Sequence, residues 1–175
     1  GLPGKVAAAI AGQAVKDDRF ELLPFSLTGP EIEETETTIE AVRVELIQPE
    51  NRAHRIEKIK AAAPDLITVD YTHPTAVNSN CAFYCEHHLP FVMGTTGGDR
   101  EKLLQTVRAS SICAVIAPNM AKQIVGFQAM LEFAAANFPG MFAGYSLTIK
   151  ESHQAAKADT SDTLTYSATD LPPGL

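Results

Sequence analysis

The sequence predicts an α/β fold built on a doubly wound, Rossmann-like parallel sheet. Short apolar runs alternate with helical patterns along most of its 175 residues, as they do in βαβ proteins. Several of the apolar runs end in segments rich in glycine, threonine or asparagine, and ligands bind at this carboxyl edge of such sheets. The content of 45% hydrophobic and 20% charged residues is that of a globular protein.

The expected elements follow in chain order. A small, apolar helix covers residues 6–15, and a strand covers 20–27, although Pro24 weakens it. Residues 28–38 are expected to form a loop, and 41–47 a half-exposed strand with Val42, Val44 and Leu46 on one face. The remaining elements are helices at 52–63, from Pro74 onward, at 99–107 and at 124–138, and strands at 65–72, 90–96, 112–119 and 145–152.

Charge and composition exclude several classes of function. The net charge of -7 leaves no basic stripe for nucleic acid, and no apolar run approaches the length of a membrane span. Three cysteines without framework spacing indicate a reducing compartment. The first residue is Gly1 and not methionine, which leaves room for a targeting peptide upstream.

The segment "GLPGKVA" has the spacing of a dinucleotide-binding turn, with Gly1, Gly4 and then Ala7 in place of a third glycine. Backbone amides in such a turn approach a pyrophosphate, and the following helix adds positive potential. Two glycines before a helix are also common in plain loops, so this motif is weak on its own. The strand that should precede it is expected to be missing from this sequence.

Two further turns are candidates for the cofactor. "MGTTGGDR" follows an apolar strand and places Gly94, Thr95 and Thr96 at the ligand edge, while Asp99 is expected to cap the next helix. "SLTG" offers Thr28 where an NAD-selective enzyme places an acid, and no carboxylate follows until Glu31. The turn therefore permits NADPH.

Two other groups of residues have competing interpretations. Cys81, Cys85 and His88 would share a helical face, but packing in the core explains them, and we predict no metal site. His153 and Lys157 follow the last strand in "ESHQAAKADTS" and form either an acid–base pair or a solvated loop.

The order of "GLPGKVA", "VDYTHP", "FVMGTTGGDR", "APNMAKQ" and "FAGYSLTIKESHQAAKADTS" resembles the dihydrodipicolinate reductase family, closest to its plant-type branch. The resemblance implies that the pyrophosphate lies on Gly1, Gly4, Lys5 and Val6. It implies that the nicotinamide half lies near Gly94, Thr95, Thr96, Ala117, Pro118, Asn119 and Met120. It further implies that His153 is catalytic, that Lys157 donates a proton, and that Gln154, Ser161 and Thr163 bind substrate.

The same resemblance implies an activity. A family member reduces 4-hydroxy-tetrahydrodipicolinate, through dihydrodipicolinate, to tetrahydrodipicolinate in the diaminopimelate route to lysine. The cofactor would be NADPH, with NADH possible, and the substrate is a small dicarboxylate. The family forms tetramers, and its members lie in the plastid stroma of plants and algae or otherwise in the cytoplasm.

The resemblance stops at Asp162, where the family has a glycine whose amide holds a substrate carboxylate. We expect residues 1–140 to form the dinucleotide-binding domain without its first strand. Residues 141–175 would begin an incomplete α+β substrate and tetramerisation domain, so we expect no activity from this chain alone. The alternative is a non-catalytic homologue that keeps the NADPH-binding fold as a sensor or assembly factor.

Overall fold

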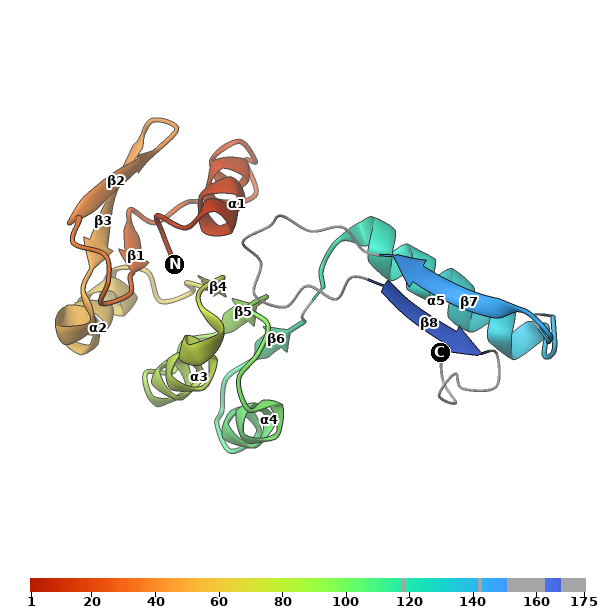
Figure 1. The fold of residues 1–175 in the computed structure, drawn as a ribbon. Helices are drawn as coiled ribbons and strands as arrows, with labels where there is room; N and C mark the ends of the chain where they lie inside the picture. Colours follow the sequence, from red (N-terminus) through yellow and green to blue (C-terminus); the bar gives the residue numbers. More distant parts are fainter. Residues whose placement is uncertain (118, 142, 151–162, 168–175) are drawn as a thin grey trace. The chain divides into compact units, whose positions relative to one another are not determined.

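The computed structural model describes residues 1–117, 119–141, 143–150 and 163–167. The chain divides into two compact units, Gly1–Pro118 and Asn119–Leu175, and each is described by itself. The first unit holds six strands and most of the helices (Figure 1). It has the α/β architecture that the sequence predicts.

The first sheet of this unit contains β1 (Phe25–Leu27), β2 (Glu36–Ile39) and β3 (Val42–Ile47), in the order β1-β3-β2. β1 runs parallel to β3, whereas β2 is antiparallel to it. The prediction of a loop over residues 28–38 is therefore wrong for residues 36–38, which belong to β2. The predicted strand over 20–27 is too long, because pairing begins only after Pro24.

The second sheet is entirely parallel, as predicted. It consists of β4 (Thr68–Asp70), β5 (Phe91–Met93) and β6 (Ala114–Ile116), with β5 in the centre. Each strand is three residues long, and the segment after each one leaves from the same edge. The segments that follow Asp70, Met93 and Ile116 therefore start as neighbours.

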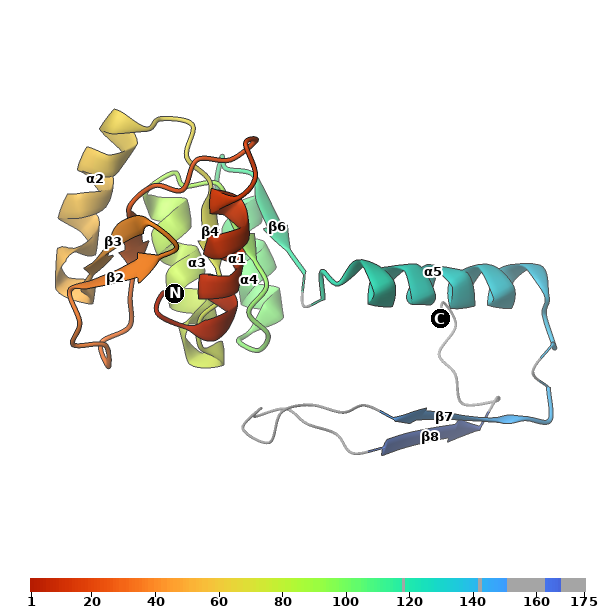
Figure 2. The same ribbon diagram turned by 90° about the horizontal axis from the view of Figure 1, so that it is seen from above.

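The predicted helices are present with boundaries shifted by one or two residues. They are α1 (Lys5–Val15), α2 (Arg52–Ala62) after the 3-10 turn η1 (Pro49–Asn51), α3 (Val77–Glu86) after η2 (Pro74–Ala76), and α4 (Arg100–Arg108). Asp99 caps α4 as expected, because its carboxylate accepts a hydrogen bond from the Lys102 amide at 3.0 Å. Figure 2 shows these helices from a second direction.

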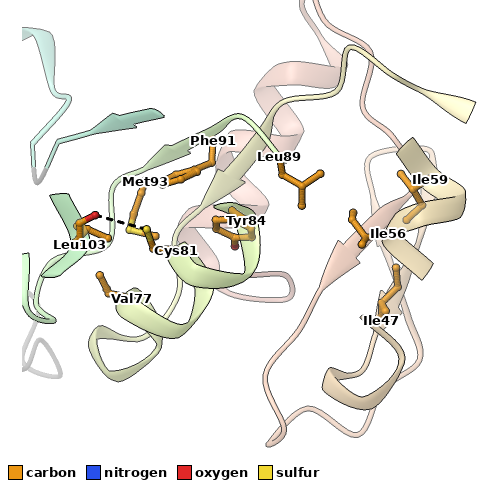
Figure 3. Close-up of a cluster of buried hydrophobic side chains, with 10 residues drawn as sticks. All are labelled: Ile47, Ile56, Ile59, Val77, Cys81, Tyr84, Leu89, Phe91, Met93 and Leu103. Carbon is orange, nitrogen blue, oxygen red and sulfur yellow. Dashed lines mark hydrogen bonds between the residues drawn. The ribbon is translucent and has the colours of Figure 1, made fainter. Parts of the chain in front are cut away.

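One apolar cluster joins the two sheets into a single unit (Figure 3). Tyr84 and Leu89 lie near its centre, and Ile47 reaches it from the first sheet. Side chains of this size contribute about 1.5–3 kcal/mol each when fully buried. The other members are Ile56, Ile59, Val77, Cys81, Phe91, Met93 and Leu103.

A second cluster fixes α1 against the first sheet. Ala11 packs with Ile39, Val44 and Leu46, and Leu2 from the turn before the helix completes the group. Val44 and Leu46 therefore face α1, while Ile47 faces the other cluster. Helical cover on both faces of a sheet is the arrangement of a doubly wound fold.

The second unit contains α5 (Lys122–Asn137) and an antiparallel pair, β7 (Ser146–Lys150) and β8 (Thr163–Ser167). The helix and β7 were expected, whereas β8 was not. The second unit begins at Asn119, so it includes α5. The extension of the dinucleotide-binding domain to residue 140 therefore stays a prediction. Within the described residues, no helix combines the length and the apolar character needed to cross a membrane.

Candidate dinucleotide site

The glycines of the N-terminal turn are required by close backbone contacts. The Gly4 amide donates to the Gly1 carbonyl at 3.0 Å, and a Cβ on Gly4 would lie 2.8 Å from that oxygen. A Cβ on Gly1 would lie 2.9 Å from the Tyr71 carbonyl oxygen at the end of β4. The turn thus approaches its neighbours more closely than a side chain permits.

The helix that follows this turn offers its first amides to an anion. Its N-cap is Gly4, which has no side chain to satisfy them, and no acidic residue lies in the first turn. Lys5 and Val6 are exposed. This is the arrangement in which helix N-termini bind phosphate groups.

Two hydroxyl groups tie the turn to the end of β1. The Leu2 amide donates to Ser26 Oγ at 3.2 Å, and Thr28 Oγ1 donates to the Leu2 carbonyl at 3.1 Å. Thr28 is only 1% exposed, so its hydroxyl proton is used inside the protein. Its visible role is to hold the turn, which the sequence did not indicate.

A cavity of about 390 Å³ opens beside this anchor. Its walls come from β1 and the segment after it, from η1 and the start of α2, and from the segment after β4 together with α3. A volume of this size is within the range of small-molecule sites. The residues that line it are Leu27, Thr28, Gly29, Pro30, Glu31, Pro49, Arg52, Thr72, His73, Thr75, Ala76, Ser79, Asn80 and Tyr84.

Two side chains of opposite charge, Arg52 and Glu31, line the cavity. The position of neither one was predicted from the sequence. Arg52 donates from Nη2 to the Thr28 carbonyl, and its Nε is buried with no hydrogen-bond partner among the described residues. Glu31 folds back, so that a Cβ on Gly29 would collide with its carboxylate. Nothing in the local pattern places Arg52, which lies 24 residues after Thr28, at this site.

The Gly94 turn is held from two sides. The Gly94 amide donates to the Asp70 carbonyl at 3.0 Å, and the ring of Tyr71 lies where a Cβ on Gly94 would be. Thr95 Oγ1 donates to Asp70 Oδ1 and accepts from the Thr72 amide, both at 2.8 Å. The Thr95 hydroxyl is thus engaged inside the protein, which leaves its backbone for any ligand contact.

Asp70 is the buried carboxylate behind both segments, and the predicted site did not include it. It is 0% exposed and accepts hydrogen bonds from the hydroxyls of Thr72 (2.9 Å), Thr95 (2.8 Å) and Tyr84 (2.7 Å) and from the Asn80 amide (2.9 Å). Burial, followed by the nearby charge of Asp70, raises the pKa of Tyr84 far above its ordinary value. Tyr84 therefore remains a hydrogen-bond donor to Asp70. The signal in the sequence was an acidic residue that ends an apolar strand.

The other predicted site residues are placed only in part. Ala117 directly follows β6, and its amide donates to the Met93 carbonyl at 3.1 Å. Asn119 and Met120 belong to the second unit, and Asn119 Oδ1 accepts from the Ala121 amide at 2.9 Å. Thr163 is the first residue of β8. Residues outside the described part of the chain are Pro118, His153, Gln154, Lys157 and Ser161.

The cysteine and histidine group of α3 is separated by the structure. Cys81 is buried in the core, as the packing interpretation predicted, whereas His88 lies beyond the end of the helix with a φ of 52°. The expectation that they share one helical face is wrong for His88. Within the residues that the structure describes, no cluster of three or more His, Cys, Asp or Glu side chains could hold a metal ion.

Comparison with known proteins agrees with this geometry. The family described as "Dihydrodipicolinate reductase, N-terminus" matches residues 1–120. "4-hydroxy-tetrahydrodipicolinate reductase 2, chloroplastic" of Arabidopsis thaliana is 44% identical over 165 residues, which are 93% of this chain and 46% of that protein. "Probable 4-hydroxy-tetrahydrodipicolinate reductase 1, chloroplastic" of Oryza sativa subsp. japonica is 43% identical over 160 residues, 91% of this chain and 46% of that protein.

Bacterial proteins match more weakly. "4-hydroxy-tetrahydrodipicolinate reductase" of Enterococcus faecalis is 29% identical over 138 residues, which are 77% of this chain and 49% of that protein. The chain spans about half the length of these curated relatives. From the match over residues 1–120 and the identity to the plant proteins, we conclude that this chain belongs to the dihydrodipicolinate reductase family.

Proposed function

We propose that the chain is the cofactor-binding part of a nicotinamide-dependent reductase that acts on 4-hydroxy-tetrahydrodipicolinate in the diaminopimelate route to lysine. The observation that carries this proposal is the glycine turn before α1, which lies between the carboxyl ends of β1 and β4. The names of its relatives support the substrate.

The residues of the turn fit a dinucleotide. Because Gly1 and Gly4 carry no side chains, the amides of Lys5 and Val6 can approach a pyrophosphate without steric hindrance. The nicotinamide group supplies a hydride when it is bound. The Gly94–Thr96 backbone, fixed by Asp70, is proposed to orient that half of the cofactor.

Protonation and substrate binding are assigned to residues that follow β7. His153 and Lys157 would supply a proton and offset the negative charge of a dicarboxylate, and Gln154, Ser161 and Thr163 would contact its carboxylates. In an active enzyme, Lys157→Ala should lower kcat by roughly 10²–10⁴-fold. His153→Gln should lower it while NADPH affinity stays nearly unchanged. Near-normal rates in both variants would disprove this assignment.

For the cofactor we propose NADPH, with Arg52 as the group that favours its 2′-phosphate. Arg52 lines the cavity beside Thr28, where an arginine can accommodate that phosphate, whereas an acid such as Glu31 would instead bind a ribose hydroxyl. Arg52→Met should weaken NADPH binding by roughly 10–100-fold, with little effect on NADH. Arg55→Met is the matched control, since Arg55 pairs with Glu45 instead.

Glu31→Gln tests whether the negative charge of Glu31, in the same cavity as Arg52, disfavours the 2′-phosphate of NADPH. Removing this carboxylate should raise the preference for NADPH, because one source of repulsion is lost. Calorimetric titration with both cofactors measures each effect. Unchanged ratios of the two affinities in the Arg52 and Glu31 variants would exclude this cavity as the selective site.

The activity can be tested in a chimera in which the matched segment of this chain replaces its counterpart in the A. thaliana relative. Substrate-dependent oxidation of NADPH, abolished by Lys157→Ala, is the expected result. A chimera that binds NADPH but shows no such oxidation would instead support the non-catalytic alternative.

Location and assembly are proposed from the relatives alone. The plant proteins are named chloroplastic, so we propose the plastid stroma if the source is a plant or alga. A homo-tetramer is proposed for the complete enzyme. A fluorescent fusion and the mass from light scattering measure these two properties.

A further inference from the structure

We propose that Asp70 is a positioning residue that sets the distance between the two halves of the dinucleotide site. The inference rests on the proposed function, since it assumes that the cavity and the Gly94–Thr96 turn bind the same cofactor. It starts from the burial of the carboxylate, which is 0% exposed at the end of β4. A buried carboxylate costs several kcal/mol unless hydrogen bonds compensate, so its partners should explain its presence.

The two oxygens of Asp70 serve different parts of the protein. Oδ2 accepts from Asn80 at 2.9 Å and from Tyr84 at 2.7 Å, both on α3. Oδ1 accepts from Thr72 at 2.9 Å and from Thr95 at 2.8 Å, which lie in two loops at the edge of the sheet. The carboxylate therefore connects one helix to both loops.

The helix side of this connection is rigid. Tyr84 is 4% exposed and lies in the main apolar cluster, and its ring is 5.2 Å from that of Phe91 (Figure 3). Asn80 is 6% exposed. Because α3 is fixed by this packing, Oδ2 holds the carboxylate in place and Oδ1 can act as a fixed point for the loops.

On the loop side, the two segments that Asp70 holds belong to different halves of the site. Thr72 lines the cavity, as do Asn80 and Tyr84, whereas Thr95 is part of the Gly94 turn. The Thr72 amide also donates to Thr95 Oγ1 at 2.8 Å. One carboxylate and one hydroxyl thus define the separation of the cavity wall from that turn.

A direct part in the reaction does not fit Asp70. A carboxylate has about four lone-pair positions, and four donors occupy them here. With 0% exposure, it offers no surface that solvent or a ligand could contact. Its influence must pass through Thr72 and Thr95, and a misplacement of about 1 Å can lower a rate by roughly 10²-fold.

The main test uses single hydroxyl deletions around this carboxylate in the chimera. Thr95→Val should lower kcat by roughly 10–100-fold, and Thr95→Ser should restore it because the hydroxyl returns. With NADPH deuterated at the transferred hydrogen, Thr95→Val should also raise the isotope effect, since hydride transfer becomes slower. Thr106→Val is the matched control. It removes a threonine hydroxyl that donates to the Lys102 carbonyl within α4 and does not line the cavity, so kcat and the isotope effect should change little.

A second measurement needs no cofactor. Amide hydrogen exchange at Thr72 should accelerate in Thr95→Val and in Asp70→Asn but not in Tyr84→Phe, because only the first two disturb its acceptor. If the parent chimera has no reductase activity, the proposed function fails while this readout still tests the positioning. If the parent is active and Thr95→Val keeps its rate and isotope effect, the positioning role of Asp70 is refuted.

Discussion

The two turns of the dinucleotide site are anchored by different chemistry. The Gly1–Gly4 turn is held by two neutral hydrogen bonds, from the Leu2 amide to Ser26 and from the Thr28 hydroxyl to the Leu2 carbonyl, with Leu2 buried in an apolar cluster. The Gly94 turn is held by the buried carboxylate of Asp70. Each turn is held in part by a threonine, Thr28 for the first and Thr95 for the second, that the sequence assigns to the ligand but whose hydroxyl is engaged inside the protein.

This difference in anchoring determines how much stability is lost when the hydrogen bonds of each turn are removed. A neutral hydrogen bond contributes about 1 kcal/mol net, and its groups can partly recover by binding water. The Asp70 carboxylate accepts from four donors, of which Asn80 and Tyr84 are buried, so its removal would leave buried donors unpaired. We therefore expect the turn beside Asp70 to be the more sensitive of the two.

The largest effect is expected from Asp70→Ala. Loss of four hydrogen bonds to a fully buried carboxylate, two of them from the buried side chains of Asn80 and Tyr84, should lower the free energy of unfolding by about 3–5 kcal/mol. Asp99→Ala is the matched control, since it removes an exposed helix cap and should cost about 1 kcal/mol. Urea unfolding measures both values, and equal losses would contradict the distinction between the two anchors.

The second-largest loss of stability is expected from Gly94→Ala. The new methyl group would meet the ring of Tyr71, and overpacking of this kind costs about 1–3 kcal/mol. Gly126→Ala in α5 is the control, because nothing lies within 4 Å of a Cβ there and alanine favours a helix by about 1 kcal/mol. A double-mutant cycle with Tyr71→Ala should show coupling. Additive losses would mean that the ring is not the obstacle.

Thr28→Val should have a smaller effect. The valine keeps the shape but loses the hydrogen bond to the Leu2 carbonyl, which should cost about 1 kcal/mol in unfolding free energy. NADPH affinity should fall several-fold as the turn loosens, and Thr28→Ser should restore both. If Thr28→Val instead removes binding completely at unchanged stability, the hydroxyl contacts the cofactor directly.

The smallest expected effect is on the pH dependence of stability, and it comes from the pair of Glu57 and His87 outside both turns. The hydrogen bond from His87 lowers the pKa of Glu57 below its ordinary value. A lowered pKa in the folded state stabilises the protein above the ordinary pKa of glutamate, and this contribution disappears as pH falls through the lowered value. The stability difference between wild type and Glu57→Gln should therefore shrink in acid. A difference that stays constant down to strongly acidic pH would contradict the pairing.

Much of the fold was predictable because its elements carry strong local signals. A strand over residues 65–72 and an N-cap at Asp99 were both predicted from the sequence, and β4 forms inside that range while α4 begins directly after Asp99. β2 was missed because its pairing depends on β3, whereas Thr37, Thr38 and the acidic residues around them suggest a loop.

The site was less predictable than the fold. Glycine spacing indicated both turns, because close backbone approach leaves a local mark in the sequence. Arg52 and Asp70 act through contacts with residues 24 and 25 positions away in the chain. Such contacts exist only after folding, so no local pattern indicates them. The hydroxyls of Thr28 and Thr95 were assigned outward for the same reason.

The antiparallel strand β2 has a consequence for aggregation. β3 would otherwise end the first sheet with unpaired backbone groups, which invite pairing with other chains. β2 covers them and forms an edge only four residues long, where Arg43 Nε donates to the Glu36 carboxylate at 2.7 Å. Short, charged edges discourage further strand addition. The acidic segment that resembles a loop thus protects that side of the sheet from intermolecular pairing.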